Sequence, residues 1–132
     1  MDEEIFKISR DLNRGKMLRE MALDRLKDLK DLKKNYKIIE EYYEIIKELI
    51  TSIMYFDGFK TLSHKSLIYY LKKKYGSVFL GKDFIIMDNL RLLRNNIMYY
   101  GQKADESFLV NYKPSLVAII EKLLKLIDNK IK

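Results

Sequence analysis

Apolar residues recur at intervals of three and four along most of this chain, and this spacing most constrains its fold. One clear stripe runs from Met17 to Leu32, and another runs from Ile39 to Met54. Such spacing gathers apolar side chains on one face of an α-helix, whereas a half-buried strand needs alternation with a period of two. No segment alternates for long enough to predict a strand, and the 132 residues include only one proline and five glycines. The sequence therefore predicts an all-α protein.

Capping and turn residues set the expected helix boundaries. Side chains suited to the first position before a helix occur at Asn35, Thr61, Ser63 and Asp83. Glycines that suit a helix end follow at Gly58, Gly76 and Gly101. Pro114 suits the first turn of a last helix, and a short helix is expected over residues 2–13. The predicted fold is an up-and-down helical bundle of four core helices plus shorter helices. It forms a single domain over residues 1–132, with residues 1–14 as an N-terminal extension helix.

Composition narrows the class of protein. No apolar run approaches the ~20 residues of a membrane-spanning helix, and the acidic start of the chain has no apolar signal segment. Cysteine is absent, which excludes disulfides and cysteine-based zinc sites, and we expect a cytoplasmic protein. With a single histidine as well, the sequence predicts no metal and no cofactor. The net charge of +7 favours an acidic partner such as nucleic acid, although dispersed lysines also suit solvated helix faces.

The segment 94–101 departs from the apolar pattern of its helix. Arg94, Asn95 and Asn96 interrupt an apolar stripe, and Tyr99 and Tyr100 then lead to a glycine. Unpaired polar groups in a helix that faces a core cost about 1–3 kcal/mol each, so this cluster needs a reason. A guanidinium presents a fork that suits phosphate oxygens, and the amides and tyrosine hydroxyls suit hydrogen bonds to the same ligand. An ion pair of Arg94 with Glu44 or Glu48 on a neighbouring helix is the structural alternative.

The segment resembles the signature of the HEPN family, in which an arginine and a polar residue are followed, four to six residues later, by histidine. Residues 42–50 and the turn 58–64 also resemble parts of small prokaryotic HEPN proteins, and the similarity spans roughly residues 17–128. Tyr99 stands where the family has its histidine. The resemblance implies a helical bundle that dimerises about a two-fold axis and binds RNA or a nucleotide. It also implies a minimal nucleotidyltransferase as partner, in a toxin–antitoxin pair.

Catalysis is the open question in this interpretation. A tyrosine with a pKa near 10 is ~0.1% ionised at pH 7, so Tyr99 is a poor general base. His64 is the only histidine and is expected in the first turn of a helix, in a structural or partly exposed role. We therefore expect an RNA- or nucleotide-binding homodimer that is weak or inactive as an enzyme. Two alternatives stay open. One is a metal-independent ribonuclease that uses Arg94 with Tyr99 or His64, and the other is an interaction module without chemistry.

Overall fold

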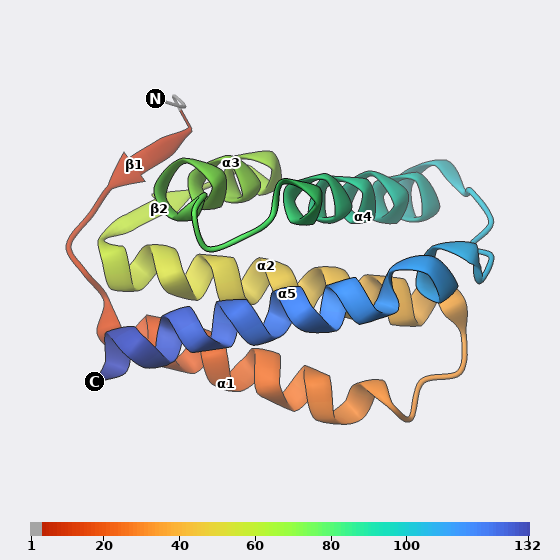
Figure 1. The fold of residues 1–132 in the computed structure, drawn as a ribbon, viewed down its shortest axis with the longest axis horizontal. Helices are drawn as coiled ribbons and strands as arrows, with labels where there is room; N and C mark the ends of the chain where they lie inside the picture. Colours follow the sequence, from red (N-terminus) through yellow and green to blue (C-terminus); the bar gives the residue numbers. More distant parts are fainter. Residues whose placement is uncertain (1–3) are drawn as a thin grey trace.

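The computed structural model describes residues 4–132 and confirms the predicted all-α helical bundle (Figure 1). Its described part contains five helices and one small two-stranded sheet. The elements in chain order are β1 (Ile5–Lys7), α1 (Leu12–Leu29), α2 (Asn35–Asp57), β2 (Phe59–Thr61), α3 (His64–Tyr75), α4 (Gly81–Tyr100) and α5 (Ser107–Ile131).

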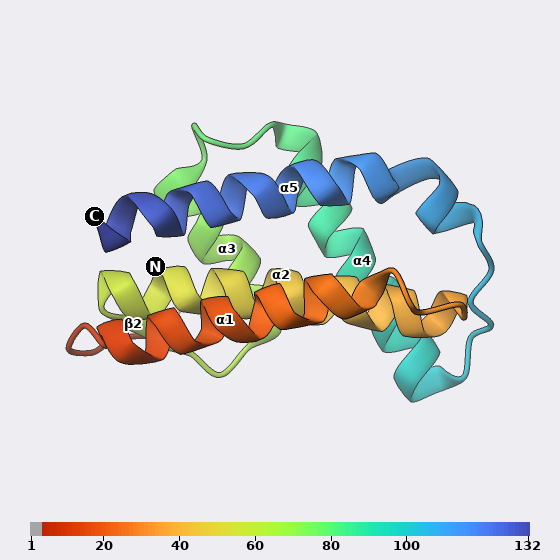
Figure 2. The ribbon, with the colours of Figure 1, turned by 90° about the horizontal axis from the view of Figure 1, so that it is seen from below.

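Helix α2 is the centre of the bundle. It contacts all four other helices, and side chains such as Leu49, Ile53 and Met54 are completely buried. Helices α1 and α5 lie lengthwise along α2, whereas α3 and α4 cross it obliquely (Figure 2). Because α3 and α4 cover one side of α2, a polar residue on that side of α2 faces their side chains. This arrangement positions the candidate site described below.

A close approach between α1 and α2 depends on Gly15. A Cβ atom at this position would lie 2.7 Å from Cε2 of Phe56, which is too close for any larger residue without a shift. The Ser52 hydroxyl donates a 2.6 Å hydrogen bond to the Gly15 carbonyl oxygen. Gly15 therefore lies within α1 and allows tight helix packing.

The N-terminal expectation is wrong. The predicted helix over 2–13, within an extension over 1–14, is replaced from Ile5 to Lys7 by a strand paired antiparallel with β2, and α1 begins at Leu12. Residues 1–3 lie outside the described part. Gly58 explains how the chain enters β2: at φ 88° it ends α2 in the left-handed conformation and turns the chain into the strand. Three-residue strands are too short to give a visible alternation.

The other boundaries hold with local corrections. Ser63 caps α3 as predicted, and α4 ends at Gly101 with φ 70°. Helix α2 begins at Asn35 itself, so Asn35 is not the cap. Asp83 lies inside α4, where its carboxylate accepts the Leu80 N–H at 3.0 Å. Pro114 is not in the first turn of α5, because that helix begins at Ser107 and continues through the proline, which removes one helical hydrogen bond.

A buried carboxylate joins the ends of three helices. Asp57, whose side chain is only 8% exposed, accepts hydrogen bonds from the hydroxyls of Tyr70 (2.7 Å) and Tyr75 (2.6 Å) and from Lys130 Nζ (2.7 Å). Burial alone would raise the pKa of Asp57, but the hydrogen bonds from Lys130, Tyr75 and Tyr70 outweigh it and lower the pKa. These hydrogen bonds connect the end of α2 to α3 and α5.

Candidate functional site

A cluster of polar and aromatic side chains lies where α4 and the start of α3 meet α2. Its main members are Arg94 and Tyr99 from α4, Glu40 and Tyr43 from α2, and His64 from α3. Residues three apart on a helix share a face, so Glu40 and Tyr43 both point toward the crossing helices. The oblique crossing of α2 thus brings residues from three helices together.

Glu40 holds the Arg94 guanidinium in a bidentate ion pair. The Nε atom donates to Glu40 Oε2 at 2.7 Å, and Nη2 donates to Oε1 at 3.1 Å. Glu44 Oε1 is more distant, at 3.9 Å from Nη2. The Arg94 side chain is only 12% exposed, and the Glu40 hydrogen bonds raise its pKa further above the usual range for arginine. The positive charge is therefore permanent and fixed in orientation.

The remaining edge of the guanidinium meets weaker partners. Nη1 donates to Tyr99 Oη at 3.1 Å and to Asn95 Oδ1 at 3.4 Å. The Arg94 Cζ atom also lies 5.0 Å from the centre of the Tyr43 ring and 5.5 Å from that of Tyr99. Tyr99 is 66% exposed, so this edge of Arg94 is covered by a side chain that can swing into solvent.

His64 joins the cluster through Tyr43. The Tyr43 hydroxyl and His64 Nδ1 are 2.5 Å apart. Burial raises the pKa of Tyr43 to about 12, against the opposing charge of Arg94, so its hydroxyl stays protonated and donates. Partial desolvation lowers the pKa of His64, and the charges of Lys47 and Arg94 lower it further. The neutral imidazole therefore accepts at Nδ1 and carries its proton at Nε2.

We predict that His64 resists protonation in the folded state. Because the unfolded chain takes up this proton more readily, the contribution of His64 to stability should decline as the pH falls below about 6.5, the ordinary histidine value. A 15N NMR titration should show the Nε2–H tautomer at pH 7 and a pKa below that of a model peptide. In a Tyr43→Phe variant the tautomer preference should weaken. A doubly protonated ring at pH 7 would contradict this geometry.

The Arg94 edge and the His64 imidazole differ in how their polar atoms are engaged. The Nη1 edge of Arg94 faces the surface, where an anion can replace the two weak partners. His64 has its Nδ1 lone pair engaged by Tyr43, whose ring is also in contact with the Arg94 guanidinium. General base catalysis at the Arg94 edge would need a base with a free lone pair, and the nearest carboxylates, Glu40 and Glu44, are both engaged in ion pairs.

The structure separates the predicted site residues into two groups. Arg94, Tyr99 and Asn95 are in contact, and His64 is linked to them through Tyr43. Asn96 instead lines a separate hollow between α4 and the start of α5, together with Asn89, Gln102 and Asn111. Tyr100 is 80% exposed at the end of α4 and lies outside the packed cluster.

Sequence reasoning missed Glu40 and Tyr43. It named Glu44 or Glu48 as the ion-pair partner of Arg94, but Glu40 is the main partner, and Glu48 pairs with Arg25 at 2.8 Å. The sequence places Tyr43 in an apolar stripe and in the HEPN-like segment 42–50, but indicates no role for it in the site. The available signal was the spacing of Glu40, Tyr43 and Glu44, which places two carboxylates and a hydroxyl on one helix face.

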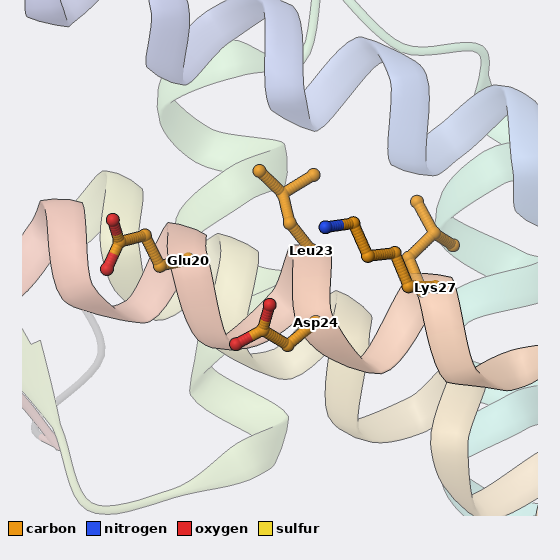
Figure 3. Close-up of a pocket in the computed structure, with 5 residues that line it drawn as sticks. Glu20, Leu23, Asp24 and Lys27 are labelled. Atoms are coloured by element: carbon orange, nitrogen blue, oxygen red, sulfur yellow. The ribbon is translucent and has the colours of Figure 1, made fainter.

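Another hollow, of about 610 Å³, lies along the surface of α1. It is lined by Glu20, Leu23, Asp24, Leu26 and Lys27. Figure 3 shows the Leu23 side chain directed toward α5, with the carboxylates of Glu20 and Asp24 at the side of α1. All five residues come from one helix, and their charges are mixed. This surface groove therefore brings together no set of groups comparable with the Arg94 cluster.

No family model, curated protein or solved structure matches this chain. The resemblance to HEPN proteins stays a prediction that rests on the residues quoted above. Within residues 4–132, no helix is long and apolar enough to span a bilayer. The same residues contain no group of three or more histidine, cysteine or carboxylate side chains placed to hold a metal ion.

Proposed function

We propose that this chain is a HEPN-like, cytoplasmic homodimer that binds RNA or a nucleotide through a phosphate contact at Arg94, and that it is degenerate for catalysis. The observation that supports this most is the geometry of the guanidinium. Glu40 fixes one edge in a bidentate pair, while the Nη1 edge donates, among residues 4–132, to Tyr99 and Asn95. A phosphate oxygen that replaces Tyr99 would receive a charge-assisted hydrogen bond from a group that is already oriented.

Charges of both signs surround the proposed phosphate contact. The charges of Lys47, Arg94 and Arg91 lower the pKa of His64, whereas that of Glu44 raises it. Arg91 and Lys47 are paired with Asp88 and Glu44 at 2.9 Å and 2.8 Å within their own helices. The site therefore has both signs of charge, and we expect specificity for one phosphate position rather than a broad basic surface.

RNA affinity should fall steeply with salt and depend on Arg94. Each neutralised phosphate of a single strand contributes a slope of about −0.7 to the logarithm of affinity against salt. We expect Arg94→Ala to weaken binding by about 1–3 kcal/mol and Arg94→Lys to weaken it less, since lysine keeps the charge but not the fork. Fluorescence anisotropy with a short labelled single-stranded RNA measures both effects.

The matched control for this experiment is Arg19→Ala. Arg19 pairs with Asp128 at 3.0 Å on another part of the surface, so its loss removes the same charge elsewhere. Binding that is unaffected by salt, or equal losses in the Arg19 and Arg94 variants, would contradict a site at Arg94. The interaction-module alternative would then be preferred.

An exposed apolar stripe on α4 supports the dimer proposal. Ile85, Leu92 and Tyr99 are seven residues apart and all exposed, so they form one line on the surface of α4, on the side of the helix away from the Arg94 backbone. Spacing of seven residues is typical of a helix that packs against a partner helix. Pairing of two α4 helices about a two-fold axis would cover this stripe, and the Tyr99 side chain at its end reaches back to the Arg94 guanidinium.

Leu92→Glu should convert the dimer into a monomer. A charged residue in the centre of the pairing stripe would leave an uncompensated carboxylate in a desolvated interface. Sedimentation velocity at tens of micromolar should show a dimer for the wild type and a monomer for the variant. Val110→Glu, at an exposed position on α5, is the control and should stay dimeric. A monomeric wild type would refute the dimer.

The proposed protein partner is a minimal nucleotidyltransferase, in a toxin–antitoxin pair, and this part rests on the HEPN resemblance alone. A metal-independent ribonuclease is the second candidate function. The observation in its favour is that Tyr99 Oη lies 3.1 Å from Arg94 Nη1, so the arginine and the residue in the position of the family histidine are in contact. A Tyr99→His variant, assayed for RNA cleavage in EDTA, separates binding from cleavage.

A further inference from the structure

A further concave site lies at the end of α3 opposite from His64. It is a mainly apolar hollow of about 320 Å³ between β1, β2 and α3, and its lining residues are Ile5, Phe59, Tyr69, Tyr70, Lys73 and Lys74. This size falls within the range of small-molecule sites, which are mostly apolar with a few fixed polar groups. None of these residues belongs to the Arg94 cluster, so the site is independent of the proposed function.

The walls of the hollow are aromatic rings held in place by the fold. Strand β2 carries Phe59, whose ring centre lies 5.6 Å from that of Tyr70 with the planes tilted by 50°. The Tyr70 hydroxyl is bound to Asp57 at 2.7 Å, so that ring cannot turn freely. Strand β1 supplies Ile5 through its antiparallel pairing with β2. The correction at the N-terminus thus creates this site, because a helix over residues 2–13 would not have placed Ile5 there.

Two ammonium groups are the polar part of the lining. Lys74 Nζ lies 5.3 Å from the Phe59 ring centre and 5.8 Å from that of Tyr70. Its carboxylate partner Asp57 is 3.5 Å away and is already bound more closely by Lys130, at 2.7 Å. Lys73 is exposed beside it. The hollow therefore combines flat apolar walls with positive charge that Asp57 only partly offsets.

We propose that this hollow binds a small organic anion with a flat apolar body, such as an aromatic carboxylate, sulfonate or phosphate. The aromatic walls suit ring stacking, which adds to the burial of apolar area. Lys73 and Lys74 supply the charge that complements the acid group, and the lining residues within 4–132 include no carboxylate that would repel it. An uncharged molecule of the same shape would use the walls but not the two lysines.

A pair of fluorescent probes tests this proposal. The anion 8-anilinonaphthalene-1-sulfonate and the uncharged N-phenyl-1-naphthylamine share one aromatic body and differ in the sulfonate. We expect the anion to bind with a stoichiometry of one per chain and more tightly than the neutral probe. Lys73→Glu should raise the Kd of the anion about tenfold, because it reverses a charge at the rim. The Kd of the neutral probe should change little.

Lys72→Glu is the matched control, since Lys72 has the same charge on the same helix turn but does not line the hollow. It should leave both Kd values within about twofold of the wild type, because a charge on solvated surface is screened. Tyr69→Ala, which removes an exposed wall residue, should weaken both probes. No saturable binding, equal affinity for the two probes, or equal effects of the Lys72 and Lys73 variants would overturn the proposal.

Discussion

Replacing Tyr99 with histidine is expected to raise metal-independent RNA cleavage by about 10²–10⁴-fold, the usual contribution of a positioned general base. The wild type should cleave weakly or not at all, because tyrosine is almost fully protonated at pH 7 whereas an ordinary histidine has a large neutral fraction. Tyr99 is exposed and contacts Arg94, so an imidazole can be accommodated there next to the guanidinium. Initial rates on single-stranded RNA at pH 7 in EDTA measure the effect.

Two variants control this experiment. Tyr100→His introduces the same group one position further along, outside the cluster, and should give no gain. Arg94→Ala combined with Tyr99→His should abolish the gain, because the transferring phosphoryl group would lose its stabilising charge. The idea fails if the wild type already cleaves RNA efficiently and Tyr99→Phe leaves the rate unchanged. Another group, with His64 as the first candidate, would then carry the reaction.

Asp57→Ala should lower the free energy of unfolding by about 3–5 kcal/mol. We expect this loss to be larger than that from removing any other polar contact named above. The substitution would leave the Lys130 ammonium and the hydroxyls of Tyr70 and Tyr75 without their shared acceptor. Urea unfolding followed by circular dichroism measures the free energy of unfolding. Asp128→Ala is the control: Asp128 is half-exposed in its pair with Arg19, so its loss should cost about 0–1 kcal/mol.

The same carboxylate gives a pH dependence with a defined sign. The pKa of Asp57 is lower in the folded state than in the unfolded chain. Its contribution to stability should therefore be complete above the ordinary aspartate value of about 4 and should decline as the pH falls below it. In Asp57→Ala this part of the acid destabilisation should be missing. Identical acid unfolding of the variant and the wild type would refute the assignment.

The helices could be predicted from sequence because each carries its own signal. Apolar spacing marks α2 over its whole length, and Gly58, Gly101 and Ser63 end or begin helices by local backbone chemistry. The β1–β2 pair could not be predicted from sequence, because its two three-residue strands are defined only by their pairing, which joins residues more than fifty positions apart. The start of α5 was missed since Pro114 is compatible both with a first turn and with a helix that tolerates one lost hydrogen bond.

Only some of the site residues could be predicted from sequence, for a similar reason. Arg94 and Tyr99 stand out because they are near in sequence and interrupt an apolar pattern. Glu40 and Tyr43 are placed beside them by the crossing of α2 and α4, and a periodicity of 3.6 residues says which residues share a face but not which helix covers it. The role of His64 depends on a hydrogen bond to Tyr43, 21 residues away. Only the tertiary structure brings these groups together.

The central claim, that a phosphate of RNA binds at Arg94, is tested most directly by NMR of arginine side chains. The Nε–Hε signals of Arg94 and Arg25 should both be observable, since each Nε donates to a glutamate, Glu40 and Glu48 respectively. Arg94→Lys assigns the first signal. On titration with a short single-stranded RNA, we expect the Arg94 signal to shift saturably while the Arg25 signal does not move. Saturable RNA binding that leaves the Arg94 signal unchanged would contradict the account.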